Sequence, residues 1–160
     1  MSTRPTEPFR SEHAHLLSHL EQLRVAAREL SRLSPIERGA AVETALAFLR
    51  GTLMPHARAE EEVLYPEWAR LVGYPDAAAP MLHDHAAIAV RVERLEDTSA
   101  EDIETLQELL FELHALIGVH LRKEEDIQLP AFDRRPPEEV AALLERMGEH
   151  HVHHEPEAAR

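Results

Sequence analysis

In each half of the chain before its last twelve residues, a histidine is followed by a glutamate four residues later, and a further histidine precedes each of these two pairs by several helical turns. The six residues are His13, His56, Glu60, His85, His120 and Glu124. A His and a Glu at this spacing share one helix face, so the imidazole can bind one metal ion while the carboxylate bridges to a second. Each of two metal ions would then receive two nitrogens and two oxygens.

The composition restricts the metals that such a site could hold. The 160 residues include 12 His and no Cys. The lack of thiols excludes disulfides, thiolate zinc sites and Fe–S clusters, so any metal must be held by nitrogen and oxygen. Mixed imidazole and carboxylate ligation with open positions suits iron or manganese better than a closed structural zinc site. The open positions could accept water, dioxygen or peroxide.

Apolar residues recur three or four positions apart along four long segments, which is typical of amphipathic helices. The predicted helices run from about Pro8 to Leu33, Pro35 to Val72, Ala79 to Glu96 and Ser99 to Leu129, with a short fifth helix from Arg135 to Met147. Short connections between long helices favour an all-α, up-down antiparallel four-helix bundle. Ser99 and Asp102 resemble a capping box at the start of the fourth helix.

The candidate ligands lie on the apolar seams of these helices. On the fourth helix the seam is Ile103, Leu106, Leu110, Leu113, Ile117, His120, Glu124 and Ile127. Burying ionisable groups costs several kcal/mol unless something compensates, and a bound cation would do so. His13 and His56 lie equally far from the turn at Ser34 and Pro35, so an antiparallel pair of helices places them side by side.

The chain also contains an internal repeat. The segment HARAEEEVLYP (56–66) matches HLRKEEDIQLP (120–130), and EHAHLLSHLEQL (12–23) matches DHAAIAVRVERL (84–95) in its acid-His start and its apolar spacing. A duplicated helical pair folded back on itself predicts a pseudo-twofold, dinuclear centre.

This order, H…HxxxE…H…HxxxE with each HxxxE followed by a Glu and a hydrophobic-Pro pair, resembles the hemerythrin-like HHE cation-binding family over residues 9–132. The resemblance implies a non-haem diiron centre with an oxo or hydroxo bridge, held by the six residues above; manganese or zinc is less favoured. Oxygen-carrying hemerythrins have a second His where this chain has Ala89, and HxxxxD where it has His120 and Glu124. These departures favour the family's divergent branch, for which sensing, iron handling and peroxide decomposition have been proposed.

Two functions follow as expectations. The first is a diiron protein that binds or reacts with dioxygen or hydrogen peroxide, with catalase-like decomposition of peroxide as its enzymatic form. The second is an oxygen or redox sensor, or an iron-handling module, without turnover. A plain interaction bundle, whose buried His and Glu pair among themselves, is the least favoured interpretation.

Several other residues near the motifs leave alternatives open. His15 competes with His13, although His13 has the better register, while His83 and His114 are expected outside the ligand set. Tyr65 is expected to pack in the core, with a ligand or redox role as the alternative, and Trp68 is expected in the core. Glu61 and Glu125 are expected in solvent; alternatively they accept a hydrogen bond from a ligand imidazole.

The net charge and the hydropathy of the chain limit the partners and the cellular location that we expect. The net charge of -13 repels phosphate backbones, so nucleic-acid binding is not expected. No apolar run is long enough for a membrane span, and the first residues lack a signal peptide's apolar core, so we expect a cytoplasmic protein. The expected organisation is an arm (1–8), the bundle (9–132), a short helix (133–148) and a His-rich flexible tail (149–160). The pattern does not indicate an oligomeric state.

Overall fold

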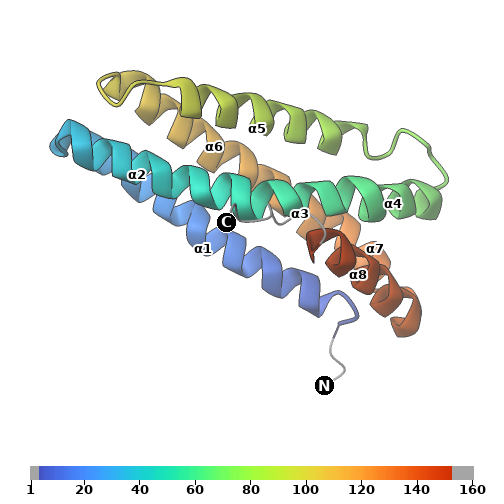
Figure 1. The fold of residues 1–160 in the computed structure, drawn as a ribbon. Coiled ribbons are helices and arrows are strands. Elements are labelled where there is room, and N and C mark those ends of the chain that lie inside the picture. The colour runs from blue at the N-terminus through green and yellow to red at the C-terminus, as the bar shows by residue number, and fades with distance from the viewer. Residues whose placement is uncertain (1–3, 153–160) are drawn as a thin grey trace.

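The computed structural model describes residues 4–152, and all regular structure within them is helical (Figure 1). The helices are α1 (Glu7–Glu29), α2 (Pro35–Phe48), α3 (Met54–Ala59), α4 (Tyr65–Val72), α5 (Ala79–Asp97), α6 (Ile103–Lys123), α7 (Leu129–Phe132) and α8 (Pro137–Val152). α2, α3 and α4 follow one another as a single long rod, and α6 and α7 form another (Figure 1). The predicted all-α four-helix bundle with a short fifth helix is confirmed.

The ends of the helices follow from local sequence, with one correction. Ser34 caps α2 in a capping box with Glu37, and Pro35 occupies the first turn. Gly73 ends α4 with φ 70°, a left-handed conformation that glycine adopts without a steric penalty. The cap predicted at Ser99 is wrong: Asp102 is the N-cap of α6, because its carboxylate accepts the Thr105 N–H at 3.1 Å.

Three π turns interrupt the rods, and each precedes a proline. They span Leu49–Leu53, Glu60–Leu64 and Glu124–Gln128. In each case the next residue donates its backbone N–H to the carbonyl five positions earlier, as Tyr65 does to Glu60, and the residue after that is proline. Proline lacks an N–H and crowds the preceding turn, so the wider π turn keeps the rod continuous where an α-helix would break.

A π turn also changes which residues face the core. Its extra residue rotates the following segment by roughly 100° relative to a regular α-helix. As a result Gln128 is buried, whereas Ile127, which the seam predicted inside, is 60% exposed. The prediction for Ile127 is wrong because a period of 3.6 residues does not continue through the π turn.

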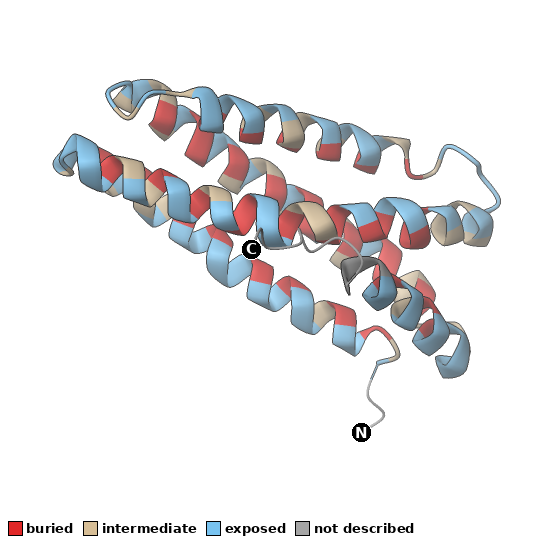
Figure 2. Ribbon diagram, in the orientation of Figure 1, coloured by how far each residue is buried: buried red, intermediate tan, exposed pale blue. Residues whose placement is uncertain are grey.

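The buried residues form two clusters along the inner faces of the helices (Figure 2). The first is a leucine-rich cluster in the body of the bundle, which includes Leu20, Leu49 and Leu113. The second lies at the other end, where Val140 and Leu143 of α8 share a cluster with Ala59. α8 packs against α3 and the π turn Glu60–Leu64. It continues to Val152, past the predicted end at Met147; residues 153–160 of the predicted tail lie outside the described residues.

Among residues 4–152, none of the helices combines the length and the apolar composition that crossing a membrane requires.

Candidate metal centre

Four rods bring the six predicted ligand residues together in one buried layer of the bundle. α1 supplies His13, α3 and the following π turn supply His56 and Glu60, α5 supplies His85, and α6 and its π turn supply His120 and Glu124. Each of the six side chains is buried, with at most 5% of its residue exposed. The antiparallel helices therefore bring His13 and His56 to the same level of the bundle, as their equal distances from the turn at Ser34 and Pro35 predict.

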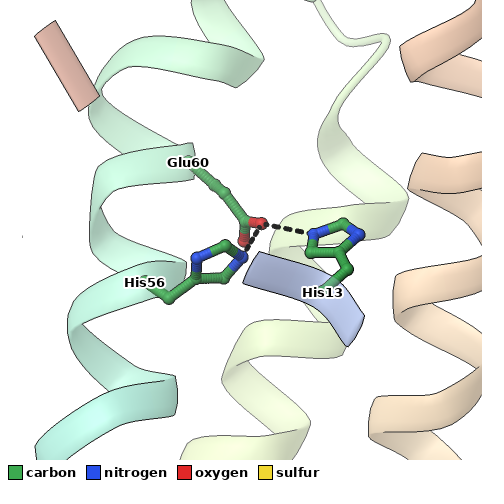
Figure 3. Close-up of side chains that lie close together, drawn as sticks. All are labelled: His13, His56 and Glu60. Atoms are coloured by element: carbon green, nitrogen blue, oxygen red, sulfur yellow. Dashed lines mark ion pairs between the residues drawn. The ribbon is translucent and has the colours of Figure 1, made fainter. Parts of the chain in front are cut away.

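One half of this layer contains His13 and His56. The Nε2 atoms of these histidines lie 3.8 Å and 2.7 Å from Oε1 of Glu60, as Figure 3 shows. Oε2 of Glu124 lies 3.4 Å from Nε2 of His13. The ligand atoms of His13, His56 and Glu60 form a compact group that could hold a metal ion, and Glu124 adds a second carboxylate oxygen beside His13.

The other half contains His85 and His120, whose Nε2 atoms are 3.0 Å apart. They lie 3.3 Å and 3.9 Å from Oε2 of Glu60. Oε1 of Glu124 is 3.6 Å from Nε2 of His120. Each glutamate thus turns one oxygen toward each half, which is the geometry of two bridging carboxylates.

Several polar atoms at the centre of the layer have no hydrogen-bond partner. Both oxygens of Glu60, Oε2 of Glu124 and Nε2 of His13 are buried and form no hydrogen bond. Buried carboxylate oxygens without a donor or a cation are costly. The donor set, two imidazole nitrogens and two carboxylate oxygens on each side, fits a pair of divalent cations that would offset this cost.

The charge balance of the two glutamates supports the same interpretation. Burial by itself raises the pKa of Glu60, but the surrounding imidazoles, led by His56, outweigh it and hold that pKa well below the usual value. Burial and the negative charge of Glu60 raise the pKa of Glu124. Burial lowers the pKa of His56, yet Glu60 and Glu12 outweigh it and raise the value to about 10. The surrounding imidazoles therefore stabilise the negative charge of Glu60 more than that of Glu124.

The Nδ1 atom of every histidine in the layer also contacts a carboxylate, on the side of the ring away from the centre. The pairs are His13 with Glu125 at 2.8 Å, His56 with Glu12 at 3.5 Å, His85 with Glu61 at 2.7 Å and His120 with Asp84 at 3.2 Å. A carboxylate in this place holds the proton on Nδ1 and leaves the Nε2 lone pair directed at the metal. The four pairs therefore orient all four imidazoles toward the centre.

Two of these carboxylates were weighed in the sequence and two were missed. Solvation was favoured for Glu61 and Glu125, and the structure shows the less favoured alternative, a contact with an imidazole of the layer. Glu12 and Asp84 were not predicted, although each directly precedes a candidate ligand in the repeated acid-His start. That repeated acid was the signal that could have identified them.

Cations stabilise two of the outer carboxylates. Lys123 donates to Asp84 at 2.6 Å, and Arg10 pairs with Glu125 and, at 3.2 Å, with Asp133. Since Asp133 also accepts from Thr6, a chain of polar contacts connects the start of α1 with the end of α7 and with His13.

Tyr65 was expected to pack in the core, and the structure places its hydroxyl at the centre. The ring is buried, and the hydroxyl donates to Oε1 of Glu124 at 2.9 Å and lies 3.2 Å from Nε2 of His85. Burial, reinforced by the charges of Glu60 and Glu124, raises the pKa of Tyr65, so the phenol keeps its proton. The hydroxyl oxygen could bind a metal ion, or the hydroxyl could donate a hydrogen bond to a ligand of the centre.

Three other histidines, His15, His83 and His114, lie outside the layer. His15 is exposed and its Nδ1 contacts the Ser11 carbonyl at 2.7 Å, so His13 is the residue of α1 that faces the layer. His83 is exposed, and His114 is partly exposed near Glu21. Trp68 is partly buried against Phe132 in the second cluster.

Comparison with known proteins identifies the domain. The family model described as the hemerythrin HHE cation binding domain matches residues 4–132. No curated protein and no solved structure matches the chain. The matched residues include the whole candidate metal centre, and α8 lies beyond them.

Proposed function

The chain belongs to the hemerythrin HHE cation-binding family, and on that premise we propose that it is a non-haem diiron protein that binds or reacts with dioxygen or hydrogen peroxide. The proposed ligands of the two iron ions are His13, His56, Glu60, His85, His120 and Glu124. The proposed enzymatic form of this reactivity is the decomposition of hydrogen peroxide.

One observation carries the proposal: each of two buried glutamates presents one oxygen to each of two histidine pairs. This arrangement gives four donor atoms to each of two centres, so a six-coordinate iron or manganese ion would keep about two positions open, whereas a structural zinc site is closed by four ligands. Imidazole and carboxylate donors without thiolate suit iron or manganese. The family resemblance favours iron.

The chain's own residues would prepare the site for such a reaction. When bound, the two iron ions supply electron transfer between ferrous and ferric states. The outer carboxylates keep Nδ1 of each imidazole protonated, and the leucine layers of α1 and α6 exclude bulk water from one side of the centre. Tyr65 holds a proton at its hydroxyl, 2.9 Å from Glu124, where it can donate to a bound ligand.

Metal analysis combined with absorption spectroscopy tests the proposal. We expect about two iron ions per chain, with charge-transfer bands in the near ultraviolet. Oxygen release from hydrogen peroxide, measured with an electrode, tests turnover separately. Metal content far below one iron per chain after aerobic reconstitution would rule out the diiron centre, even if the protein is folded.

The alternative function is an oxygen or redox sensor, or an iron-handling module, without turnover. The contact of α8 with α3 and with the π turn Glu60–Leu64 favours this alternative. Metal binding at His56 and Glu60 would act on the segments against which α8 packs, so it could change the stability of α8. Iron-dependent protection of α8 against hydrogen exchange, with no oxygen release from peroxide, would identify this function.

A further inference from the structure

A small cavity lies beside the candidate metal centre, between α3 and α5. Its floor is formed by residues of both halves of the centre: His56, Glu60, His85 and His120. About 10 Å³ is free for the centre of a water-sized sphere, which is room for about one molecule of that size. A ligand in this cavity would therefore touch the proposed iron site without rearrangement of the six ligand residues.

The walls of the cavity are apolar. They are formed by Leu53, Met54, Ala57, Ile88 and Leu121. All of these residues are buried except Met54, which is partly exposed. Met54 is therefore the apolar lining residue with the most contact with solvent, and its unbranched thioether side chain can change rotamer at little cost.

The internal repeat has a different residue at the position of Met54 on the other side of the bundle. Met54 corresponds to Gly118, at the offset of 64 residues that relates the two HxxxE segments. At Gly118, α6 is a regular helix, and a Cβ atom there would lie only 3.6 Å from Leu20 of α1, so the two helices pack closely. Beside Met54, by contrast, the π turn Leu49–Leu53 replaces the regular helix, and π turns are frequent at functional sites.

We propose that Met54 gates the route to the centre, and that this route admits molecules no larger than dioxygen or hydrogen peroxide. The inference rests on the proposed function. The size of the cavity excludes an organic hydroperoxide.

Nitric oxide is a suitable probe because it is neutral, diatomic and binds ferrous iron without turnover. Full-length protein is loaded with ferrous iron, and the rate of nitric oxide binding is followed by stopped-flow absorbance. We expect Met54→Trp to slow binding about tenfold or more, which corresponds to a barrier about 1.4 kcal/mol higher. Met54→Ala should accelerate binding and, in a peroxide assay, allow reaction with tert-butyl hydroperoxide, which the wild type should exclude.

Two further variants separate the route from general loosening of the fold. Ala57→Val fills the cavity from its wall and should also slow nitric oxide binding. Leu46→Ala removes a partly buried side chain that packs against the core cluster but does not line the cavity, so its rate should equal that of the wild type. Iron content is measured in every variant, so a change in rate is compared only between equally loaded proteins.

The outcomes distinguish this inference from the proposed function. Wild-type protein that binds no iron would overturn the proposed function, and the inference with it. Fully loaded Met54→Trp and Ala57→Val proteins that bind nitric oxide within twofold of the wild-type rate would overturn the Met54 route alone, and leave the diiron proposal standing.

Discussion

The hydroxyl of Tyr65 lies 2.9 Å from Oε1 of Glu124, and the repeat provides no second hydroxyl, because Leu129 stands at the corresponding position. Both residues follow a π turn and precede a proline, so the two backbones are equivalent there. The side chains make the centre asymmetric: the half that contains His85 and His120 has a phenol, and the half that contains His13 and His56 does not.

Replacing Tyr65 with phenylalanine should destabilise the protein and alter the centre. The change leaves Oε1 of Glu124 buried without its donor, which costs about 1–3 kcal/mol. Denaturant unfolding of the metal-free protein measures this loss, and the absorption spectrum of the iron-loaded protein reports the change at the centre. Tyr74→Phe is the matched control, because Tyr74 is 59% exposed and should tolerate the change. Equal stability of the two variants would contradict the hydrogen bond.

Removing a bridging carboxylate should affect both metal ions, whereas removing one histidine should mainly affect one. Glu60 presents an oxygen to each histidine pair, so we expect Glu60→Ala to lose most of both irons. His13 contacts only the first half, so His13→Ala should retain about one iron per chain. Metal analysis of purified, reconstituted proteins tests this difference. A Glu60→Ala protein with wild-type iron content would show that Glu60 does not bridge.

The outer carboxylates should tune metal affinity without touching the metal. Asp84→Asn removes the charge that orients Nδ1 of His120 and that pairs with Lys123. Loss of such a partner typically lowers metal affinity about 10- to 100-fold. Competition with a coloured chelator measures the change. Glu93→Gln, at an exposed position on the same helix, is the control and should bind metal like the wild type.

The pH dependence of stability should reveal the hydrogen bonds from Thr6 and Arg10 to Asp133, which connect α1 with the end of α7. Burial raises the pKa of Asp133, but hydrogen bonds from Thr6 and Arg10 outweigh it and lower the pKa below the usual value. A depressed folded-state pKa stabilises the protein above the unfolded value of about 3.9, and this contribution is lost as the pH falls through the folded value. The difference in unfolding free energy between wild type and Asp133→Asn, measured without metal, should therefore be larger at pH 7 than at pH 3. An equal difference at both pH values would contradict this assignment.

Metal removal should lower the melting temperature. Ions that bind only the folded chain stabilise it by about 2.7 kcal/mol when present at 100 times their dissociation constant. Calorimetry with and without a chelator measures this effect, with Glu60→Ala as a control that should respond little. An unchanged melting temperature in the wild type would favour the plain interaction bundle, in which His and Glu pair among themselves.

The positions of the helices and of the six candidate ligands could be predicted from the sequence because both depend on local spacing. A helix repeats every 3.6 residues, so His120 and Glu124 must share the face that carries Leu113 and Ile117. Equal distances from the turn at Ser34 then place His13 beside His56. Whether the six residues bind iron stays a prediction, which the metal analyses above address.

The π turns explain part of what the sequence analysis missed. Each inserts a residue that shifts the helix face, so Ile127 turns outward and Gln128 inward. The same kind of turn at Glu60–Leu64 precedes Tyr65, whose hydroxyl reaches the centre. The prolines after these turns mark their places in the sequence, but a proline inside a helix is equally compatible with a kink or a break.

The sequence by itself determined the fold class, the layer in which the ionisable residues meet and the duplicated order of the ligands. These properties follow from periodicity and chain length, which are local. Only the tertiary structure decided which oxygen faces which nitrogen, which acids contact the imidazoles from outside, and that a small cavity lined in part by Met54 adjoins the centre. These depend on how helices rotate and pack against one another, and contacts between distant segments are set by the shapes of all the side chains between them.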